Sequence, residues 1–215
     1  MNRSFFSLAL CLLLFSYSLA AAGVLNVPGD YDFIHEAVQA CAAGDTVMVA
    51  AGTYYDCTHP TEGPESTPAC VIMKSGVTLI GAGQEQTIID AEGLGRGIFI
   101  ELVDDCRVEN LQIRNAFAAI YGAGILVRNV DTTVEITDVR VTTCTDGGII
   151  CINNSSPSLR NVTMDHCAAK QGGGLAIEEN SSPLVIDCVV TLNNAPSGAG
   201  IFMRNNCAPT IRGCV

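Results

Sequence analysis

The strongest constraint on the fold of this chain is a motif that returns every 26 residues in its second half. Gly148–Cys151 is followed by Gly174–Ile177 and then by Gly200–Met203. Ser155–Pro157 is followed at the same step by Ser181–Pro183. Weaker copies of the first motif lie upstream, at Gly97–Ile100 and Gly124–Val127. A repeat of this length indicates that each copy is one structural unit, which buries its apolar face against the next copy.

A second repeated motif, which we call the second ladder, has four positions. The first and fourth are apolar, the second is any residue, and the third is Asn, Asp or Gly. Its members are Val108–Leu111, Ile136–Val139, Leu159–Val162, Val185–Cys188 and Ile211–Cys214, with an earlier copy at Leu79–Ala82. Asn, Asp and Gly tolerate the left-handed backbone conformation, so this column predicts a bend between two short strands. Short strands joined by bends at fixed places form one coil, and coils stack about 4.8 Å apart. A β-sandwich would instead show antiparallel hairpin turns.

The sequence therefore predicts an all-β fold, a right-handed parallel β-helix of about six to seven coils, as one domain over residues 21–215.

The N-terminal residues of this domain differ from the repeats. Residues 31–42 carry apolar side chains at helical spacing, with Asp32 near the N-cap, and a strand is expected over residues 46–51. We expect this helix to cover the open end of the core and hide a strand edge. The C-terminal end is expected to be uncapped or truncated.

The first 20 residues are expected to be a signal peptide, because Arg3 precedes the apolar run Phe5–Phe15 and small residues follow it. That run is too short to span a bilayer, and no later apolar run is long enough. We therefore expect a secreted or cell-surface protein without a transmembrane segment in the mature chain. The net charge of the whole chain is −11. This acidic balance argues against nucleic acid as a partner, which requires a basic surface.

The residues 33–38 and 44–49, together with the Gly52–Tyr55 box, resemble the opening of pectin-lyase-like β-helix proteins, pectin methylesterases among them. The Ser-Ser-Pro and Gly-Gly-Leu repeats of residues 147–215 are similar to the β-helix repeats of bacterial surface proteins, including the polymorphic outer-membrane-protein type. The resemblance implies the fold strongly. It implies little about activity, because this fold hosts many functions.

Catalytic residues of the enzymes with this fold were not recognised. The methylesterase motifs expected downstream of Gly52–Tyr54 are missing, and there is no Gly-His-Gly turn of the hydrolase kind. A lyase-like site would need a calcium-binding carboxylate cluster and a basic residue, which Arg128 with Asp131, or Arg114, could supply. Asp165 and His166 are adjacent, and strand alternation would place them on opposite faces. The catalytic residues stay unknown, no cofactor is expected, and calcium enters only under the lyase alternative.

Alternation within the first motif places one apolar column and one mixed column on the outer surface of the rod. The apolar column is Phe99, Leu126, Ile150, Ala176 and Phe202, and the mixed column is Glu101, Arg128, Ile152, Glu178 and Arg204. The binding residues predicted from these columns are Phe99, Glu101, Leu126, Arg128, Ile150, Glu178, Phe202 and Arg204. An apolar strip of this length indicates a contact surface, unless a loop or a further segment covers it.

Ten cysteines remain after the expected cleavage. Cys57 and Cys70 bracket a Pro-rich segment, and export permits disulfides, so we predict that these two form a bridge. The other cysteines fall at repeat positions and suit small buried hydrophobic residues. No Cys-x-x-Cys pair occurs and there are three His, which does not suit a zinc site.

Two functions remain open from the sequence. The favoured expectation is a secreted or surface-exposed module that binds a glycan or a cell-surface partner without a catalytic site. The alternative is a carbohydrate-active enzyme, either a polysaccharide lyase or a glycoside hydrolase. The absence of recognisable catalytic motifs favours the first, and the resemblance to pectin-lyase-like proteins keeps the second open.

Overall fold

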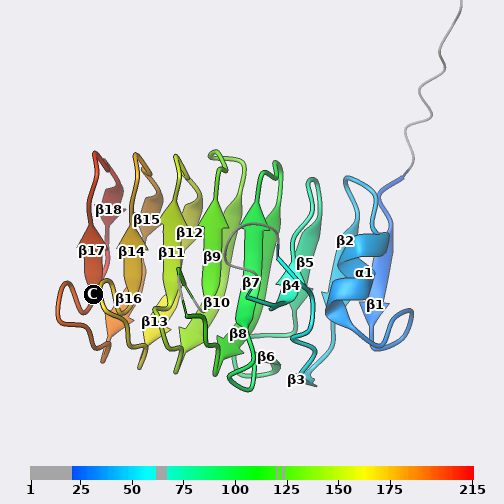
Figure 1. The fold of residues 1–215 in the computed structure, drawn as a ribbon. Helices are drawn as coiled ribbons and strands as arrows, with labels where there is room; N and C mark the ends of the chain where they lie inside the picture. The colour runs from blue at the N-terminus through cyan, green and yellow to red at the C-terminus, as the bar shows by residue number, and fades with distance from the viewer. Residues whose placement is uncertain (1–20, 62–66, 120, 123) are drawn as a thin grey trace, which may run out of the picture.

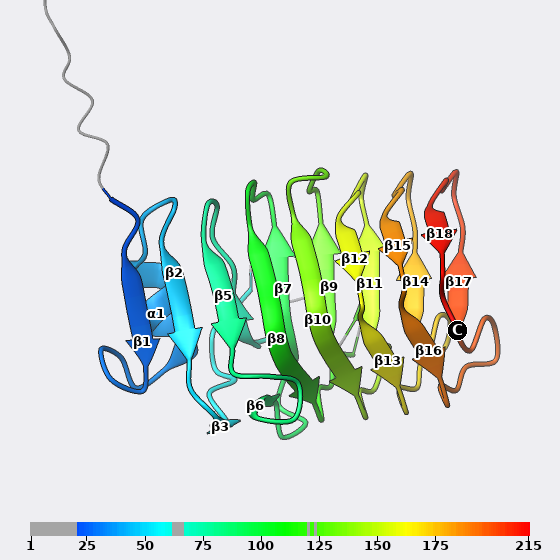
Figure 2. The ribbon, with the colours of Figure 1, turned by 180° about the vertical axis from the view of Figure 1, so that it is seen from behind.

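The chain folds as a rod of stacked turns in a computed structural model that describes residues 21–61, 67–119, 121–122 and 124–215. Figures 1 and 2 show the turns following one another along the rod, with strands on both of its long faces. The strands form one 12-stranded and one six-stranded sheet, and all their pairings are parallel. The predicted parallel β-helix is confirmed, with about seven turns. The expected signal peptide lies outside the described residues.

Each turn begins with a strand of the larger sheet. These first strands are β1 (Val24–Val27), β2 (Thr46–Val49), β5 (Thr78–Gly81), β8 (Arg107–Arg114), β10 (Glu135–Thr142), β12 (Ser158–Arg160), β15 (Leu184–Ile186) and β18 (Thr210–Arg212). The second strands are β3 (Gly52–Tyr54), β6 (Thr87–Asp90), β13 (Thr163–Asp165) and β16 (Val189–Thr191). In the middle of the rod β8 and β10 continue through the bend and supply both strands of their turns.

The bend between first and second strands is the column that the second ladder predicted. Its residues are Asn110, Asp138, Asn161, Asp187 and Gly213, with φ of 55°, 54°, 50°, 52° and 65°. All five lie in the left-handed region, which Asn, Asp and Gly enter at low cost. The bend turns the chain between strands that are stacked in register, as Ile136 is with Val108 and with Leu159.

Third strands form the six-stranded sheet. They are β4 (Ala69–Ile72), β7 (Arg96–Glu101), β9 (Ile125–Arg128), β11 (Ile149–Ile152), β14 (Leu175–Ile177) and β17 (Ile201–Met203). Ile149 pairs with Leu175 and Leu175 with Ile201, as the 26-residue step predicts. Ile149 and Leu175 are fully buried, whereas Ile201 is partly buried and Met203 is 51% exposed in the last described turn.

The single described helix, α1 (Ile34–Ala40), is shorter than the predicted 31–42 and begins after Phe33, without a side-chain cap. It lies beside β4 at the edge of the six-stranded sheet (Figure 1). His35 Nδ1 accepts a hydrogen bond from Ile72 N at 3.2 Å, and Gln39 Nε2 donates to Ile72 O at 2.9 Å. The helix thus satisfies backbone groups of an edge strand, as expected, and prevents further pairing there.

The interior of the rod is filled by the inward side chains of all three strand positions. Because these side chains are almost fully buried, any function has to use the outer faces of the sheets or the loops between them. No helix in the described ranges is long and apolar enough to cross a membrane.

Candidate functional site

The predicted apolar column lies on the outer face of the six-stranded sheet, but it is not exposed. Phe99, Leu126, Ile150 and Ala176 are 4%, 1%, 5% and 0% exposed, and only Phe202 is half-buried. The prediction of an exposed apolar strip is therefore wrong. Alternation identifies the face on which a side chain lies, but the loops that precede the strands then fold onto that face.

Contacts with Gly122 and Gly172 show how closely the loops approach. A Cβ built on Gly122 would lie 3.1 Å from the side chain of Ile150, and one on Gly172 would lie 2.7 Å from the Cβ of Ala176. Tyr121 also packs against this outer cluster. Side chains larger than glycine at these positions would displace the loops, so the covering is built into the sequence.

Two arginines fix the same covering around Phe99. The guanidinium groups of Arg96 and Arg128 lie 6.0 and 5.4 Å from the centre of the Phe99 ring. Arg96 is 1% exposed and donates from Nη1 to Thr67 O at 3.1 Å and from Nε to Tyr121 O at 3.2 Å. Arg96 therefore connects the segment around Thr67 to the segment around Tyr121, which is a structural role.

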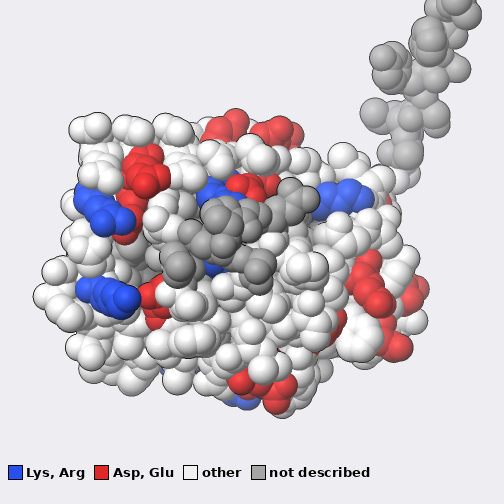
Figure 3. Space-filling view, viewed as in Figure 1, with Lys and Arg blue, Asp and Glu red and all other residues white. Residues whose placement is uncertain are grey.

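The mixed column is a set of ion pairs between neighbouring turns. Arg128 pairs with Glu101, and Arg204 Nε lies 2.9 Å from Glu178 Oε2. Ile152, between the two pairs, is buried. Figure 3 shows basic and acidic side chains lying against each other on this face. The four charged residues of this column therefore form ion pairs between neighbouring turns. A role for them in binding stays a prediction.

Cys57 and Cys70 lie together in the core as free, buried thiols. A hydrogen bond with the Cys57 sulfur and, next in size, burial raise the pKa of Cys70 well above its usual range. The two sulfur atoms are therefore neighbours, as the predicted bridge requires, and the bridge itself stays a prediction. Most other cysteines in the described chain are buried, as expected for small hydrophobic residues.

The residues considered for a lyase site are not brought together. Arg114 Nε lies 2.7 Å from Asp90 Oδ2, Arg128 pairs with Glu101, and Asp131 accepts hydrogen bonds from Thr133. Among the residues with described positions, no group of three or more His, Cys, Asp or Glu could hold a metal ion.

A different surface, the outer face of the second strands, carries a run of polar side chains on successive turns. We call it the polar face. It consists of Asp90, Gln112, Arg114, Arg140, Thr142, Thr163 and Asp165. The residues that alternate with them, Ile89, Ile113, Val141 and Met164, point into the core and are at most 1% exposed. Stacking of the turns thus lines up hydrogen-bonding groups on one side of the rod.

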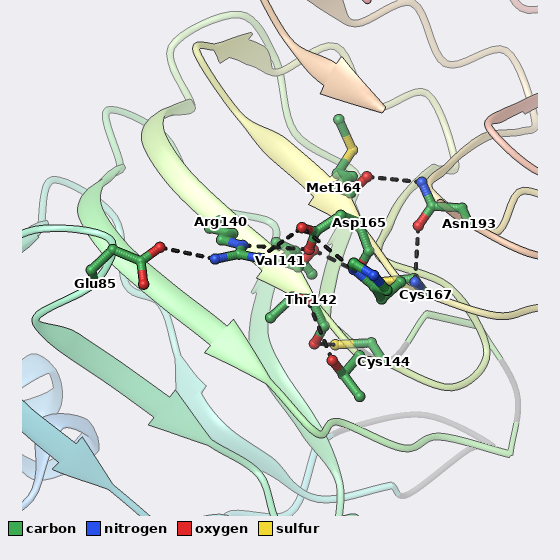
Figure 4. Close-up of polar contacts among 11 residues, drawn as sticks. Glu85, Arg140, Val141, Thr142, Cys144, Met164, Asp165, Cys167 and Asn193 are labelled. Atoms are coloured by element: carbon green, nitrogen blue, oxygen red, sulfur yellow. Dashed lines mark hydrogen bonds and ion pairs between the residues drawn. The ribbon is translucent and has the colours of Figure 1, made fainter. Parts of the chain in front are cut away.

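Arg140 organises the centre of the polar face (Figure 4). Its Nη2 lies 2.8 Å from Asp165 Oδ2, and its Nη1 lies 2.9 Å from Glu85 Oε1. Burial would raise the pKa of Asp165, but hydrogen bonds from Arg140 and Thr142 outweigh it and hold that pKa below its usual range. Asp165 is therefore ionised at neutral pH.

His166 corrects one expectation from strand alternation. Its Nδ1 lies 3.6 Å from Asp165 Oδ2, although adjacent strand residues were expected on opposite faces. The reason is that β13 ends at Asp165 and His166 has a φ of 53°, which turns its side chain back. The Asp165 carboxylate also accepts a hydrogen bond from Arg140, so Arg140 and His166 both lie against the same carboxylate.

Asp90 occupies the equivalent place three turns earlier. Its carboxylate accepts from Arg114 Nε at 2.7 Å and from Asn115 Nδ2 at 3.0 and 3.1 Å. Burial would raise its pKa, but these hydrogen bonds lower it below the usual range. Asp90 also accepts from Glu92 N at 3.1 Å and its side chain is 7% exposed, so it is a fixed acceptor that positions the Asn115 amide.

Phe117 stands beside this carboxylate and was not predicted as a site residue. Its side chain is 47% exposed. It lines a groove of about 680 Å³ together with Asp90, Glu92, Gly93, Asn115, Ala116, Thr143 and Thr145. We call this the Phe117 groove. Phe117, Thr145, Ala168 and Asn194 are bridged from turn to turn, so Phe117 is the aromatic member of an otherwise small or polar column.

A second hollow of about 440 Å³ adjoins the groove and shares Phe117 and Thr145 with it. Asp146 and Lys170 are its charged lining residues. Burial raises the pKa of Asp146, and the nearby charge of Lys170 only partly opposes this. The Phe117 ring therefore has polar acceptors on one side and a mainly small, apolar hollow on the other.

The arrangement suits recognition of a hydroxyl-rich ring. A partly exposed aromatic face packs against the C–H groups of such a ring, while fixed carboxylate, amide and hydroxyl groups bond its polar edge. A signal in the sequence could have pointed to Phe117. Phe117 comes shortly after the polar pair Arg114 and Asn115, at the end of a strand. It is a large aromatic residue at a position where the next turns have Thr145 and Ala168.

Comparison with known proteins gives a match to one family. The sequence profile described as "Right handed beta helix region" matches residues 75–215. No curated protein sequence matches the chain. Among solved structures, the A-module of the mannuronan C-5 epimerase AlgE6 from Azotobacter vinelandii is 17% identical, covering 84% of this chain and 63% of its own, with a TM-score of 0.43. A rhamnogalacturonan lyase is 11% identical, covering 89% of this chain and 62% of its own, with a TM-score of 0.49. The chain spans less than two thirds of either protein's length.

Proposed function

This chain belongs to the family with a right handed beta helix region, and on that basis we propose that it is a secreted, non-catalytic module that binds a polysaccharide in the Phe117 groove. The expected signal peptide supports secretion, and the groove supports the ligand class. The proposal keeps the function expected from the sequence but moves the binding residues from the buried Phe99 column to the Phe117 groove.

The observation that carries the proposal is the exposed ring of Phe117 among fixed polar groups. Asn115 and Asp90 are hydrogen-bonded to each other, so their positions are set before a ligand arrives. Preorganised groups lose little freedom on binding, which favours affinity. A polymer lying along the rod would meet the Phe117 ring on one turn and the smaller or polar Thr145, Ala168 and Asn194 on the following turns.

The carboxylates of this face support binding over hydrolysis. Asp90 and Asp165 are both paired with arginines, and both have a lowered pKa. A general acid needs a carboxyl group that stays protonated near neutral pH, which neither provides.

One observation favours the enzyme alternative. Asp146 is the described carboxyl group whose pKa is raised, and it lines the hollow next to Phe117. A carboxyl group with a raised pKa suits a general acid in a lyase or hydrolase. A second carboxylate at a suitable separation would still be needed for hydrolysis, and the lining residues of the hollow include no other acid.

The test is binding of the full exported chain to a panel of neutral, anionic and cationic polysaccharides, by affinity electrophoresis. We expect retardation by at least one polymer, and Phe117→Ala to weaken it about tenfold, since loss of an aromatic contact of this kind is worth about 1–3 kcal/mol. Phe202→Ala is the matched control, because it removes the same ring from the outer face of the six-stranded sheet. Equal binding by wild type and Phe117→Ala would contradict the proposal.

A parallel assay separates binding from catalysis. The bound polymers are assayed for new reducing ends and for unsaturated sugars, with and without calcium. We expect neither product. Turnover that disappears in Asp146→Asn but survives Phe117→Ala would establish the enzyme alternative instead.

A further inference from the structure

A separate pocket of about 390 Å³ lies at the N-terminal end of the rod. It is formed where α1 begins, where β3 ends and where β4 passes beneath them. Its lining residues are Asp32, Phe33, Ile34, Thr53, Tyr54, Tyr55, Asp56, Cys70, Val71 and Ile89. None of these residues lines the Phe117 groove. The pocket is therefore a distinct place on the molecule with its own chemistry.

The pocket has an apolar floor and an aromatic rim. Ile34, Val71 and Ile89 form the floor and are 3%, 1% and 1% exposed. Phe33 and Tyr55 stand at the rim and are 46% and 52% exposed. Two exposed aromatic side chains beside one pocket provide flat faces against which a compact ring can pack.

The wall of the pocket is held in place by hydrogen bonds within the protein. Tyr54 Oη lies 3.3 Å from Val27 O and 3.1 Å from Ala50 O, so its hydroxyl is committed to the backbone. His59 Nε2 lies 2.7 Å from Asp56 Oδ2, and its ring stacks on that of His35 at 3.7 Å. Asp56 is thus positioned before any ligand binds.

The charge of the pocket is negative. Asp32 and Asp56 line it, and neither Lys nor Arg is among the lining residues. The Asp56 carboxylate bonds with His59 and with the Thr58 hydroxyl, which leaves acceptor sites on it. Figure 3 shows acidic side chains gathered over this end of the molecule. His35 adds no charge near neutral pH, because burial and His59 lower its pKa to about 4.

We propose that this pocket binds a sugar ring that carries an ammonium group, as in an amino sugar residue of a cationic glycan. The ammonium group pairs with Asp32 and Asp56, and the ring packs between Phe33 and Tyr55. An ammonium near an aromatic face is further favoured by the negative charge of that face. A uronate would instead bring its carboxylate toward two carboxylates, which is repulsive.

This inference goes beyond the proposed function, because it concerns another pocket and specifies the charge of the ligand. The acidic net charge of the chain favours the same class of ligand, since it raises the local concentration of cations. The Phe117 groove can bind a polysaccharide whether or not this pocket takes an amino sugar.

The experiment is titration of the full exported chain with a glucosamine oligomer, followed by calorimetry. The comparison ligands are the fully N-acetylated oligomer, an oligogalacturonate and an oligolysine of equal charge. The variants are Tyr55→Ala and Asp32→Asn. The control is Leu192→Ala, at a side chain that is 69% exposed and lines neither pocket, and Phe117→Ala reports on binding in the Phe117 groove. We expect the glucosamine oligomer to bind at least about tenfold more tightly than the acetylated one, and Tyr55→Ala or Asp32→Asn to weaken it about fivefold or more.

Each outcome has a defined meaning. Loss of binding in Tyr55→Ala and Asp32→Asn, with Leu192→Ala unchanged, supports the pocket. Oligolysine that binds as tightly as the amino sugar, with Tyr55→Ala unaffected, overturns it and indicates a non-specific acidic surface. Glucosamine binding that is lost only in Phe117→Ala also overturns it, yet leaves the groove proposal intact. To exclude misfolding, Tyr55→Phe should retain binding where Tyr55→Ala loses it.

Discussion

Arg140 reaches from β10 to β13, where its Nη2 lies 2.8 Å from Asp165 Oδ2. The side chain of Asp165 is 8% exposed and that of Arg140 is 29% exposed. The pair therefore connects two turns of the solenoid in a partly buried place, at the centre of the polar face.

Asp165→Asn should lower the free energy of unfolding by about 1–3 kcal/mol, because it removes hydrogen bonds that involve charged groups and leaves Arg140 without its buried partner. Urea unfolding followed by circular dichroism measures this. Glu85→Gln is the control, since Glu85 pairs with the same arginine but is 74% exposed, and it should change stability by at most about 1 kcal/mol. The pKa of Asp165 is lowered in the folded state, so its contribution is present above about pH 4 and is lost as the pH falls through the folded pKa. An effect of Asp165→Asn that is the same at pH 3 as at pH 7 would contradict this role.

His35 predicts a second pH dependence, at higher pH. Burial and the neighbouring His59 lower its pKa to about 4, and its Nδ1 must be unprotonated to accept from Ile72 N. The unfolded chain takes up this proton near pH 6.5, so stability is full above about 6.5 and falls as the pH decreases toward 4. His35→Asn keeps an acceptor close to the helix start but does not titrate. The melting temperature, measured by thermal unfolding between pH 7 and 4.5, should fall less steeply with decreasing pH in this variant than in the wild type. Parallel slopes for the two proteins would show that other groups are responsible.

Leu175 tests the register of the six-stranded sheet. Its side chain is fully buried between Ile149 and Ile201 on the adjacent turns. Leu175→Ala should cost about 2–5 kcal/mol of stability through the cavity that it leaves, and Leu175→Asp should prevent folding, because an unpaired charge would be buried. Leu94→Ala, at a side chain that is 59% exposed, should change stability by about 0.5 kcal/mol or less. A soluble Leu175→Asp protein with the native strand spectrum would disprove the register.

Cys57 and Cys70 remain predicted to form a disulfide in the exported protein, because their thiols are neighbours in the core. Mass spectrometry of the denatured, alkylated protein, with and without reduction, measures the number of blocked thiols. Cys106 is the control, since burial alone raises its pKa to about 12 and it should be alkylated without reduction. The bridge closes a short loop and should contribute about 3 kcal/mol. Two alkylated thiols at positions 57 and 70 in unreduced exported protein would reject it.

The fold could be predicted from the sequence to a large extent, because the features that determine it repeat. The step between Ile149, Leu175 and Ile201 fixes which side chains stack, and Asn110, Asp138 and Asn161 mark the bends. The apolar positions and the bend residues are local properties of the chain, and their recurrence at a fixed step shows that they are not fortuitous. The helix lies within the predicted residues 31–42 but is shorter, and it ends at Ala40 because Cys41 adopts an extended conformation, with φ −61° and ψ 144°.

The candidate site was predicted less well, for a physical reason. Strand alternation assigned Phe99 and Ile150 to the outer face, but a repeat says nothing about the path of the loops that fold over that face. The repeat does not predict an aromatic side chain at Phe117, because its counterparts Thr145 and Ala168 are small. Residues that depart from a repeat are the ones whose surroundings only the three-dimensional structure reveals.

The most direct test of the central claim is to map the ligand on the protein by amide chemical shifts in NMR spectra. The isotope-labelled chain is titrated with an oligomer of whichever polysaccharide retards it in affinity electrophoresis. If the Phe117 groove binds the polymer, the largest shifts should fall on the backbone amides of Asn115, Phe117, Thr143 and Thr145, which line it. Saturating shifts that leave these four amides unchanged and fall instead around Phe202 and Arg204 would contradict the account, and would return the binding site to the outer face of the six-stranded sheet.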